Sequence, residues 1–238
     1  MAFRPAFFPL LSTVGVDDTR TFEFTWTPGL SFAQKQRNVR ALHASIRRHF
    51  PSRRLLEVSS KSIENLGVSL SAFNLSFPVG NDFISVETAF QASKVFEKAG
   101  PFPELYSKDP RFVRDYVRSL DAGDLVGFEI NGNRWGLRPT RAFYNWIYIR
   151  ALSKNLRLSA AVCEYDCFTD IEFNPKKSLN CQAYAVALYL SMWHAGVLNE
   201  ALKDKESFLS FHPADVVVVG EGANLHVTNS LTQPTFGF

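Results

Sequence analysis

The sequence predicts an α+β fold, a mostly helical domain with small antiparallel sheets. Segments whose apolar residues recur at helical spacing are long, whereas segments of alternating apolar and polar residues are short and lie next to turn residues. Strands and helices do not alternate regularly, and neither a G-x-G-x-x-G motif nor a Walker loop occurs. A Rossmann or P-loop nucleotide-binding fold is therefore not expected.

The chain is expected to divide at its amino-terminal side. Residues 1–54 are predicted to form a strand pair and a basic helix that pack on a larger domain, residues 55–238. Two short strands are expected within residues 7–28, because large apolar side chains alternate over residues 21–26. The turn between them is placed at residues 16–19.

A single amphipathic helix is predicted to follow. Ser31 and Gln34 have the spacing of a capping box, so the helix should begin at Phe32 and run for about 20 residues. Its apolar stripe consists of Phe32, Val39, Leu42, Ile46 and Phe50. One side of the helix can thus dock on the body while the other faces outward.

Positive charge is concentrated around this helix. Residues 31–63 hold eight lysines and arginines against the single acid Glu57, a net +7, whereas the whole chain carries +3. Such a patch attracts the phosphate backbone of nucleic acids or an acidic protein surface, but a merely solvated helix face would show the same pattern. The candidate DNA-binding residues are Arg37, Arg40, Arg47 and Arg48.

The body is predicted to be mainly helical. The expected helices cover residues 85–100, 110–120, 140–154 and 178–192, with Thr140 as the cap of the third. The expected strands cover residues 55–59, 125–130, 134–137 and 215–219. Asn131-Gly132-Asn133 indicates a hairpin because Asn-Gly tolerates positive φ. Loops are placed at residues 166–174 and 228–238.

Composition is typical of a cytoplasmic protein. No apolar run approaches the ~20 residues that a membrane-spanning helix needs, and the amino terminus lacks the regions of a signal peptide. Cys163, Cys167 and Cys181 are odd in number, as expected of thiols in a reducing compartment. No paired C-x-x-C occurs and the five histidines are scattered, so neither a metal nor another cofactor is expected.

Residues 85–94 gather a carboxylate, an amide and an amine on one predicted helix. Ser85 is a suitable N-cap residue, and at 3.6 residues per turn Glu87, Gln91 and Lys94 share one face. A helix exposed to solvent would show the same polar row. The pattern alone leaves a surface face and a catalytic site open.

The sequence S-V-E-x-A-F-Q-A-x-K in this segment resembles the signature helix of the NADAR family, which is named for NAD and ADP-ribose chemistry. Residues 70–74 are similar to the family's L-S-N-F segment, with Ala72 in place of Asn. Trp146 with Ile149-Arg150 is similar to the family's W-x-x-V-(K/R) helix.

The resemblance is partial toward the carboxyl terminus. Asn180 resembles the first residue of the family's N-x-L-G-x-x-L-M, but Gln182-Ala183 replaces Leu-Gly. The usual W-G-x-G loop is absent, and residues 168–175 stand in its place. These departures resemble the divergent branch that accompanies DarT-type DNA ADP-ribosyltransferase toxins as antitoxin.

For that branch the resemblance implies removal of ADP-ribose from the exocyclic amine of guanine in DNA. The implied partners are ADP-ribosylated DNA, ADP-ribose as the product and the cognate DarT-type toxin, with no membrane. Two alternatives stay open: a small-molecule N-glycosidase acting on ribosylamino intermediates, and a non-catalytic module that binds ADP-ribose or the toxin. The +7 segment favours DNA, because a free nucleotide needs no extended basic surface.

Two routes of N-glycosidic cleavage suggest catalytic residues. A carboxylate can activate water or stabilise an oxocarbenium-like state, and Glu87 is the candidate, with Asp170 as a second carboxyl group or as an ordinary turn residue. Near a helix N-terminus Glu87 is expected to stay ionised. Alternatively, an unprotonated lysine forms a Schiff base with the opened ribose, and Lys94 and Lys61 are the candidates.

ADP-ribose also needs a diphosphate seat and polar groups that bind its sugars. Residues 174–178 place two lysines at an expected helix start, where backbone N–H groups favour phosphate. Aromatic residues are candidate walls and amides are candidate hydrogen-bonding groups, although aromatic residues on helices usually belong to the core. The candidate substrate-binding residues are Ser59, Ser60, Phe73, Asn74, Gln91, Tyr144, Trp146, Asn174, Lys176 and Asn180.

Overall fold

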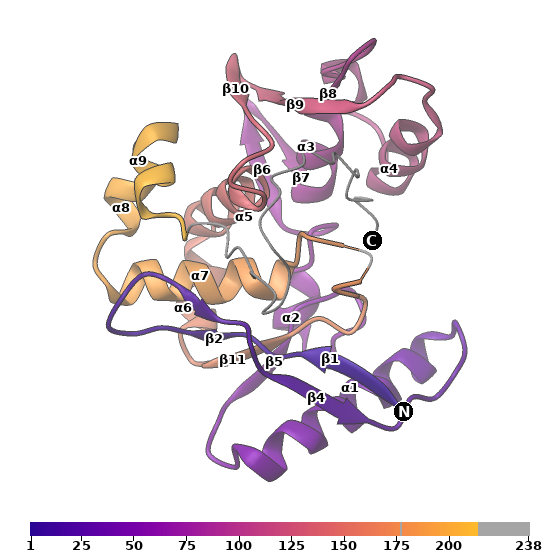
Figure 1. The fold of residues 1–238 in the computed structure, drawn as a ribbon, viewed down its shortest axis with the longest axis vertical. Helices are drawn as coiled ribbons and strands as arrows, with labels where there is room; N and C mark the ends of the chain where they lie inside the picture. Colours follow the sequence, from indigo (N-terminus) through magenta and orange to yellow (C-terminus); the bar gives the residue numbers. More distant parts are fainter. Residues whose placement is uncertain (177, 214–238) are drawn as a thin grey trace, which may run out of the picture.

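The computed structural model describes residues 1–176 and 178–213 and confirms the α+β class. Helices predominate within these residues, and the strands form separate sheets of two or three strands (Figure 1). The strand expected at residues 215–219 and the loop at 228–238 lie outside the described residues.

Four short strands precede the first helix. Strand β1 (Ala2–Pro5) pairs with β4 (Thr21–Phe24), and β2 (Phe8–Pro9) pairs with β3 (Val16–Asp17). The prediction of the turn at residues 16–19 is therefore wrong. The chain reverses earlier, where the backbone N–H of Leu10 donates to the carbonyl of Gly15 at 3.1 Å.

Helix α1 (Phe32–His49) begins as predicted, with Ser31 and Gln34 forming the capping box. Val39, Leu42 and Ile46 are buried, whereas Phe32 in the first turn is exposed. Leu42 belongs to a hydrophobic cluster that also contains Leu55 and Cys167, so the amino-terminal segment and the body share a core. The division of the chain after residue 54 stays a prediction.

Strands β5 (Leu55–Glu57) and β11 (Cys167–Thr169) form a parallel pair between the α1 region and the central helices (Figure 1). This sheet differs from the predicted antiparallel ones, and β11 lies where a loop was expected. Every residue of both strands is buried. A short strand that is buried on both faces shows no alternation of polar and apolar residues, which explains why the sequence pattern missed β11.

The middle of the chain contains α2 (Asn65–Ser69), β6 (Ser76–Val79), β7 (Asp82–Ser85), α3 (Val86–Ala92), β8 (Lys94–Phe96), η1 (Pro103–Leu105) and α4 (Pro110–Ser119). Helix α3 is shorter than predicted. It ends at Ala92 with Ser93 as the C-cap residue, because the next residues pair with a strand.

That strand is β9 (Leu125–Ile130), which pairs with β10 (Asn133–Trp135) in the predicted hairpin. Asn131 and Gly132 adopt positive φ, as expected of this turn. The hairpin lies beside α3 at one end of the molecule (Figure 1).

Helices α5 (Ala142–Lys154) and α7 (Gln182–His194) form the centre of the main core and are followed or flanked by α6 (Leu156–Val162), α8 (Leu198–Ala201) and α9 (Lys205–Phe211). Both central helices start later than predicted. Arg141, not Thr140, is the N-cap residue of α5, and α7 begins at Gln182 instead of residue 178. Apolar residues on nearly all sides of α7 gave no clear sequence boundary.

Replacing Gly67 by Ala should destabilise the fold by about 1–3 kcal/mol, the range for forcing an extra methyl group into a packed site. A Cβ at this position of α2 would lie 1.9 Å from the Glu57 carbonyl oxygen and 2.3 Å from Ser62 Oγ. The clash should exceed the gain in helix propensity. Denaturant unfolding gives the difference, with Gly136→Ala as control because its nearest atoms lie 3.9 Å away. Equal stability of the two variants would contradict this packing.

Candidate functional site

Glu87 lies in the first turn of α3 and is completely buried. Its backbone N–H donates to the carbonyl of Ala72 at 2.8 Å, which fixes the start of the helix against residues 70–74. One carboxylate oxygen, Oε1, accepts a hydrogen bond from Nε2 of Gln91 at 3.0 Å. The neighbouring positions that the helical spacing predicts for Glu87 and Gln91 are therefore confirmed.

Lys94 is the first residue of β8 instead of a helical residue, but it remains next to Glu87. Its side chain is almost fully buried, with Nζ 5.2 Å from the centre of the Phe90 ring. Burial lowers the pKa of Lys94 to about 8, against the opposing effect of the Glu87 charge. With this pKa, about a tenth of the amine is unprotonated at pH 7, far more than for an ordinary lysine. Glu87, Gln91 and Lys94 are called the Glu87 cluster below.

Two buried acceptor oxygens without partners belong to this cluster, and a third belongs to Asn180 before α7. Glu87 Oε2, Gln91 Oε1 and Asn180 Oδ1 are buried, and none forms a hydrogen bond with a described residue. An unsatisfied buried polar atom costs about 1–3 kcal/mol, and such atoms in native proteins call for an explanation. Donors from a bound molecule or from water would satisfy all three.

The loop before α7 is joined to the Glu87 cluster through Ala72. While the carbonyl of Ala72 accepts from Glu87, its N–H donates to Oε1 of Gln182 at 2.8 Å. Asn180, two residues earlier, is buried. Tyr144 on α5 is also buried, and burial raises its pKa well above the ordinary value, with smaller contributions from the charges of Glu87 and Asp170.

Helix α4 adds positive charge that the sequence reasoning missed. Burial raises the pKa of Glu87, and the charges of Lys94, Arg114 and Arg118 partly oppose this rise. The guanidinium of Arg114 also lies 5.6 Å from the centre of the Phe73 ring, so Phe73 borders α4. The sequence contained one indication of this charge: Arg114 and Arg118 are four residues apart on a predicted helix, so they lie on the same face of it.

Burial changes the expected protonation of Glu87. Desolvation raises the pKa of Glu87 and is the largest effect, ahead of the Gln91 hydrogen bond and the nearby cations that lower it. The position of Glu87 at a helix N-terminus led us to expect an ionised carboxylate, because the sequence does not show that the side chain is removed from water. A raised pKa makes a proton-donating role accessible as well as a proton-accepting one.

Ser59, Ser60 and Lys61 lie next to a second buried carboxyl group, that of Glu57. The hydroxyl of Ser59 donates to Glu57 Oε1 at 2.6 Å, and Lys61 N–H donates to Ser59 Oγ at 3.1 Å. Nζ of Lys61 lies 5.8 Å from the centre of the Phe32 ring, so this side chain faces α1. Ser60 is half-buried.

Asp170 is buried and caps a turn, because its Oδ1 accepts from the N–H groups of Glu172 and Phe173. Burial and the charge of Glu57 raise the pKa of Asp170 well above its ordinary value. Asp170 lies beside Glu57, because the N–H of the next residue, Ile171, donates to Glu57 Oε1 at 2.8 Å, and Asp170 Oδ2 lies 3.9 Å from Cys181 Sγ.

Three other candidates lie outside the Glu87 cluster. Asn74 is exposed and donates to the carbonyl of Val68 at 2.8 Å. Asn174 and Lys176 belong to a turn in which Asn174 Oδ1 accepts from Lys176 N–H at 3.1 Å. The helix start predicted for this segment is therefore wrong, because α7 begins only at Gln182, and the phosphate-binding role of Asn174 and Lys176 stays a prediction.

Trp146 packs in the core, with its ring centre 5.8 Å from that of Phe77 and 5.0 Å from that of Trp135. Its indole N–H is buried without a partner among the described residues. Trp146 is therefore a core residue, as aromatic residues on helices usually are, and its indole N–H is an unsatisfied buried donor.

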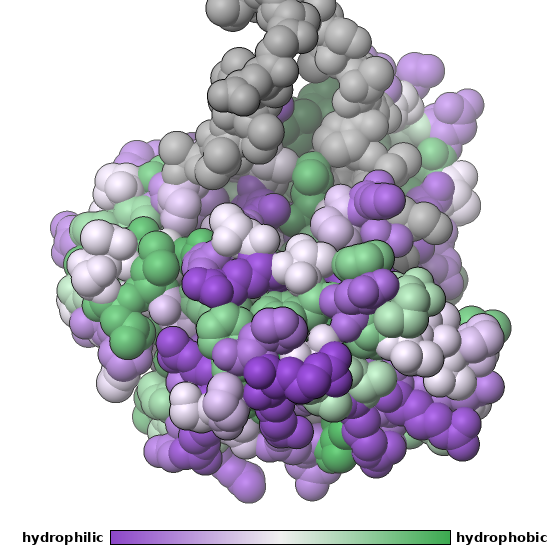
Figure 2. Space-filling view, turned by 60° about the horizontal axis from the view of Figure 1, so that its bottom comes forward, coloured by the Kyte–Doolittle hydropathy of each residue, from purple (hydrophilic) through white to green (hydrophobic). Residues whose placement is uncertain are grey.

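The four arginines of α1 are all exposed, and none forms an ion pair within residues 1–176 and 178–213. Figure 2 turns the α1 side of the molecule forward and shows strongly hydrophilic residues spread across it, with apolar residues between them. Positive charge on this face is available to a partner.

The cysteine side chains Cys163, Cys167 and Cys181 are free thiols. In the described part of the chain, no group of three or more histidine, cysteine or acidic residues is placed to hold a metal ion. None of the helices described there has the length and apolar character needed to span a membrane.

Comparison with known proteins identifies one family model that matches almost the whole chain. The model describes the DarT1-associated NADAR antitoxin and matches residues 2–218. No curated protein matches the chain. The match extends well beyond the signature segment and includes α1.

Replacing Glu87 by Gln should lower the pKa of Lys94 below its value of about 8, because the negative charge that raises it is removed. The pH dependence of modification by an amine-selective reagent, followed by peptide mass spectrometry, gives this pKa. Exposed Lys108 serves as the internal reference. An unchanged pKa in the variant would contradict the coupling of an ionised Glu87 to Lys94.

Proposed function

The chain belongs to the family of DarT1-associated NADAR antitoxins, and we propose that it is an N-glycosidase that hydrolyses ADP-ribose from guanine bases of DNA. In this role it reverses the modification made by a DarT-type toxin. The observation that supports the proposal best is the Glu87 cluster, which combines a buried carboxyl group, a buried lysine and acceptor oxygens without protein donors.

The unsatisfied oxygens match the chemistry of the proposed substrate. Ribose hydroxyls and the N–H groups of guanine are donors, so they can bond to Glu87 Oε2, Gln91 Oε1 and Asn180 Oδ1. Binding would then give each of these three unsatisfied oxygens a hydrogen bond, charge-assisted for Glu87 and neutral for the two amides. This gain depends on the protein having left those oxygens without partners of its own.

Two routes cleave the bond between the anomeric carbon and the guanine amine. In the first, the nitrogen takes up a proton as it leaves and water adds to the anomeric carbon, giving free ADP-ribose. As a carboxylate, Glu87 would stabilise the oxocarbenium-like state, take a proton from the attacking water and pass it to the leaving nitrogen. In the second, the Lys94 amine attacks the anomeric carbon of the opened sugar, displaces the guanine amine and forms an imine, which water hydrolyses.

The basic surface supports DNA as the substrate in preference to a small molecule. Arg37, Arg40, Arg47 and Arg48 are exposed on α1, where they can meet phosphates beyond the modified base. A small-molecule N-glycosidase would use the Glu87 cluster without this surface. A non-catalytic module would bind ADP-ribose or the toxin and release no product.

Replacing Glu87 by Gln should reduce the release of ADP-ribose from a DNA oligonucleotide modified at guanine by at least ~10²-fold, the scale for removing an acid–base group. Chromatography of free ADP-ribose measures the rate. Glu104→Gln is the matched control, because Glu104 is exposed in η1 and the same charge is lost. The Glu87 variant should be at least as stable as the parent protein, since a neutral amide is easier to bury than a carboxylate. Near-normal turnover by the folded variant would exclude Glu87 from the mechanism.

Borohydride added during turnover should trap ADP-ribose on Lys94 if the imine route operates. Hydride adds to the imine carbon and leaves a stable secondary amine, which peptide mapping locates. Lys94 is expected over Lys61 because Lys94 is next to Glu87 and has a pKa of about 8, whereas Lys61 faces α1. Lys94→Arg should abolish the adduct and Lys61→Arg should retain it. Full turnover without any adduct would support the carboxylate route.

A further inference from the structure

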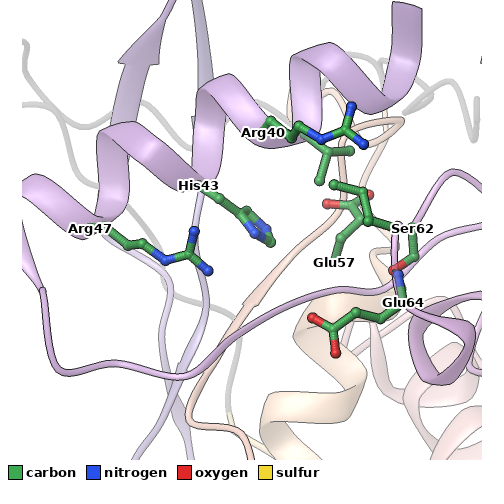
Figure 3. A pocket seen from close by; sticks show the side chains of 8 residues that line it. Arg40, His43, Arg47, Glu57, Ser62 and Glu64 are labelled. Atoms are coloured by element: carbon green, nitrogen blue, oxygen red, sulfur yellow. The ribbon is translucent and has the colours of Figure 1, made fainter. Parts of the chain in front are cut away.

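A second site lies between α1 and residues 57–64, where the structure encloses a cavity of about 200 Å³ (Figure 3). Its lining residues are Val39, Arg40, His43, Arg47, Glu57, Ser62, Ile63 and Glu64. None of them belongs to the Glu87 cluster. Liquid water occupies about 30 Å³ per molecule, so the cavity has room for several waters or one phosphate-sized group. Pockets for larger ligands usually measure about 300–1,000 Å³.

One side of this cavity is cationic. Arg40 and Arg47 are seven residues apart on α1, close to two helical turns, and lie on the same face of the helix as His43 (Figure 3). Neither arginine forms an ion pair or a hydrogen bond with another residue of the described chain. Two guanidinium groups therefore face the cavity without a protein counter-ion.

The carboxylates at the cavity are already engaged by protein donors. Glu57 is buried and accepts hydrogen bonds from the Ser59 hydroxyl, the Thr169 hydroxyl and the Ile171 N–H. Glu64 accepts a hydrogen bond from the Tyr165 hydroxyl at 2.5 Å. Burial also raises the pKa of Glu57, which reduces its negative charge. The two guanidinium groups are therefore the charged groups at this cavity that have no hydrogen-bond partner within the described residues.

His43 and Ser62 supply polar groups at the cavity wall. His43 is only 7% exposed, and its Nε2 lies 2.9 Å from Thr169 Oγ1. Because that threonine hydroxyl donates to Glu57, Nε2–H is the donor to Thr169, and Nδ1 has no hydrogen bond within the described chain. Ser62 Oγ accepts from Glu64 N–H at 3.2 Å, which leaves its own hydroxyl proton available for an anion.

We infer that this cavity is a phosphate-binding subsite, in which Arg40 and Arg47 hold one phosphodiester group of a DNA strand and Ser62 donates to it. Arginine is well suited to this role because its planar fork binds phosphate oxygens in pairs. The assignment of DNA as the source of the phosphate rests on the proposed function. The diphosphate of ADP-ribose has the same chemistry and is a separate outcome of the test.

The test compares two double variants that each remove two charges from α1. Arg40→Gln with Arg47→Gln alters the cavity, whereas Arg37→Gln with Arg48→Gln leaves it intact, because neither of those residues lines it. Fluorescence anisotropy with an unmodified single-stranded oligonucleotide measures the dissociation constant without requiring catalysis. The first pair should weaken binding by at least ~10-fold, as expected for losing charge-assisted hydrogen bonds. The second pair removes the same charge from the DNA-binding face and should weaken binding by a smaller factor, about 3-fold, because these arginines attract phosphate without lining the cavity.

Two further measurements identify the bound group. Inorganic phosphate should compete with the oligonucleotide for the parent protein and lose this effect in the Arg40/Arg47 variant. Ser62→Ala should weaken oligonucleotide binding by about 2- to 10-fold, the net worth of one ordinary hydrogen bond. Circular dichroism and thermal unfolding check that every variant is folded.

Equal losses in the two double variants would overturn the subsite, because they would show general attraction to a charged helix. No loss in either would also overturn it. If the Arg40/Arg47 variant bound free ADP-ribose more weakly but bound the oligonucleotide as the parent protein does, the cavity would be a site for the diphosphate of ADP-ribose. This result would contradict the DNA assignment. Oligonucleotide binding through the cavity without any release of ADP-ribose would retain the subsite and overturn the proposed function.

Discussion

The complete burial of the Glu87 carboxyl group is the constraint on which the rest of the candidate site depends. A buried carboxylate is expensive unless hydrogen bonds or opposite charges compensate it. Here one oxygen bonds to Gln91, the other has no partner in the described chain, and Lys94 with the α4 arginines supplies positive charge. Helix α3 carries Gln91, strand β8 carries Lys94 and helix α4 carries the two arginines. Together these elements surround one carboxyl group.

The contrast with Glu57 explains why Glu87 is the proposed reactive group. Both side chains are buried, but Glu57 accepts three hydrogen bonds from neighbouring protein groups, whereas Glu87 accepts one. A satisfied carboxylate stabilises the junction of β5 and β11 and has no capacity left for a ligand. The unsatisfied oxygen of Glu87 instead retains binding capacity, at a cost to stability that is typical of functional sites.

Features set by local chemistry were predictable from the sequence. The capping box of α1, the Asn131-Gly132 hairpin and the proximity of Glu87 to Gln91 follow from spacing and turn preferences within a few residues. Features set by distant contacts were not. Strand β11 forms only because β5 is beside it, Lys94 leaves the helix because β9 pairs with it, and the charge of Arg118 reaches Glu87 through the packing of α4.

A crystal structure of the Glu87→Gln variant with a short DNA strand carrying ADP-ribosylated guanine would show where the substrate binds. We expect the modified nucleotide to lie at the Glu87 cluster, with its donors bonded to Gln91 Oε1 and Asn180 Oδ1 and its anomeric carbon next to residue 87. Binding elsewhere, or protein donors already bonded to those two oxygens, would contradict Glu87 as the reactive group.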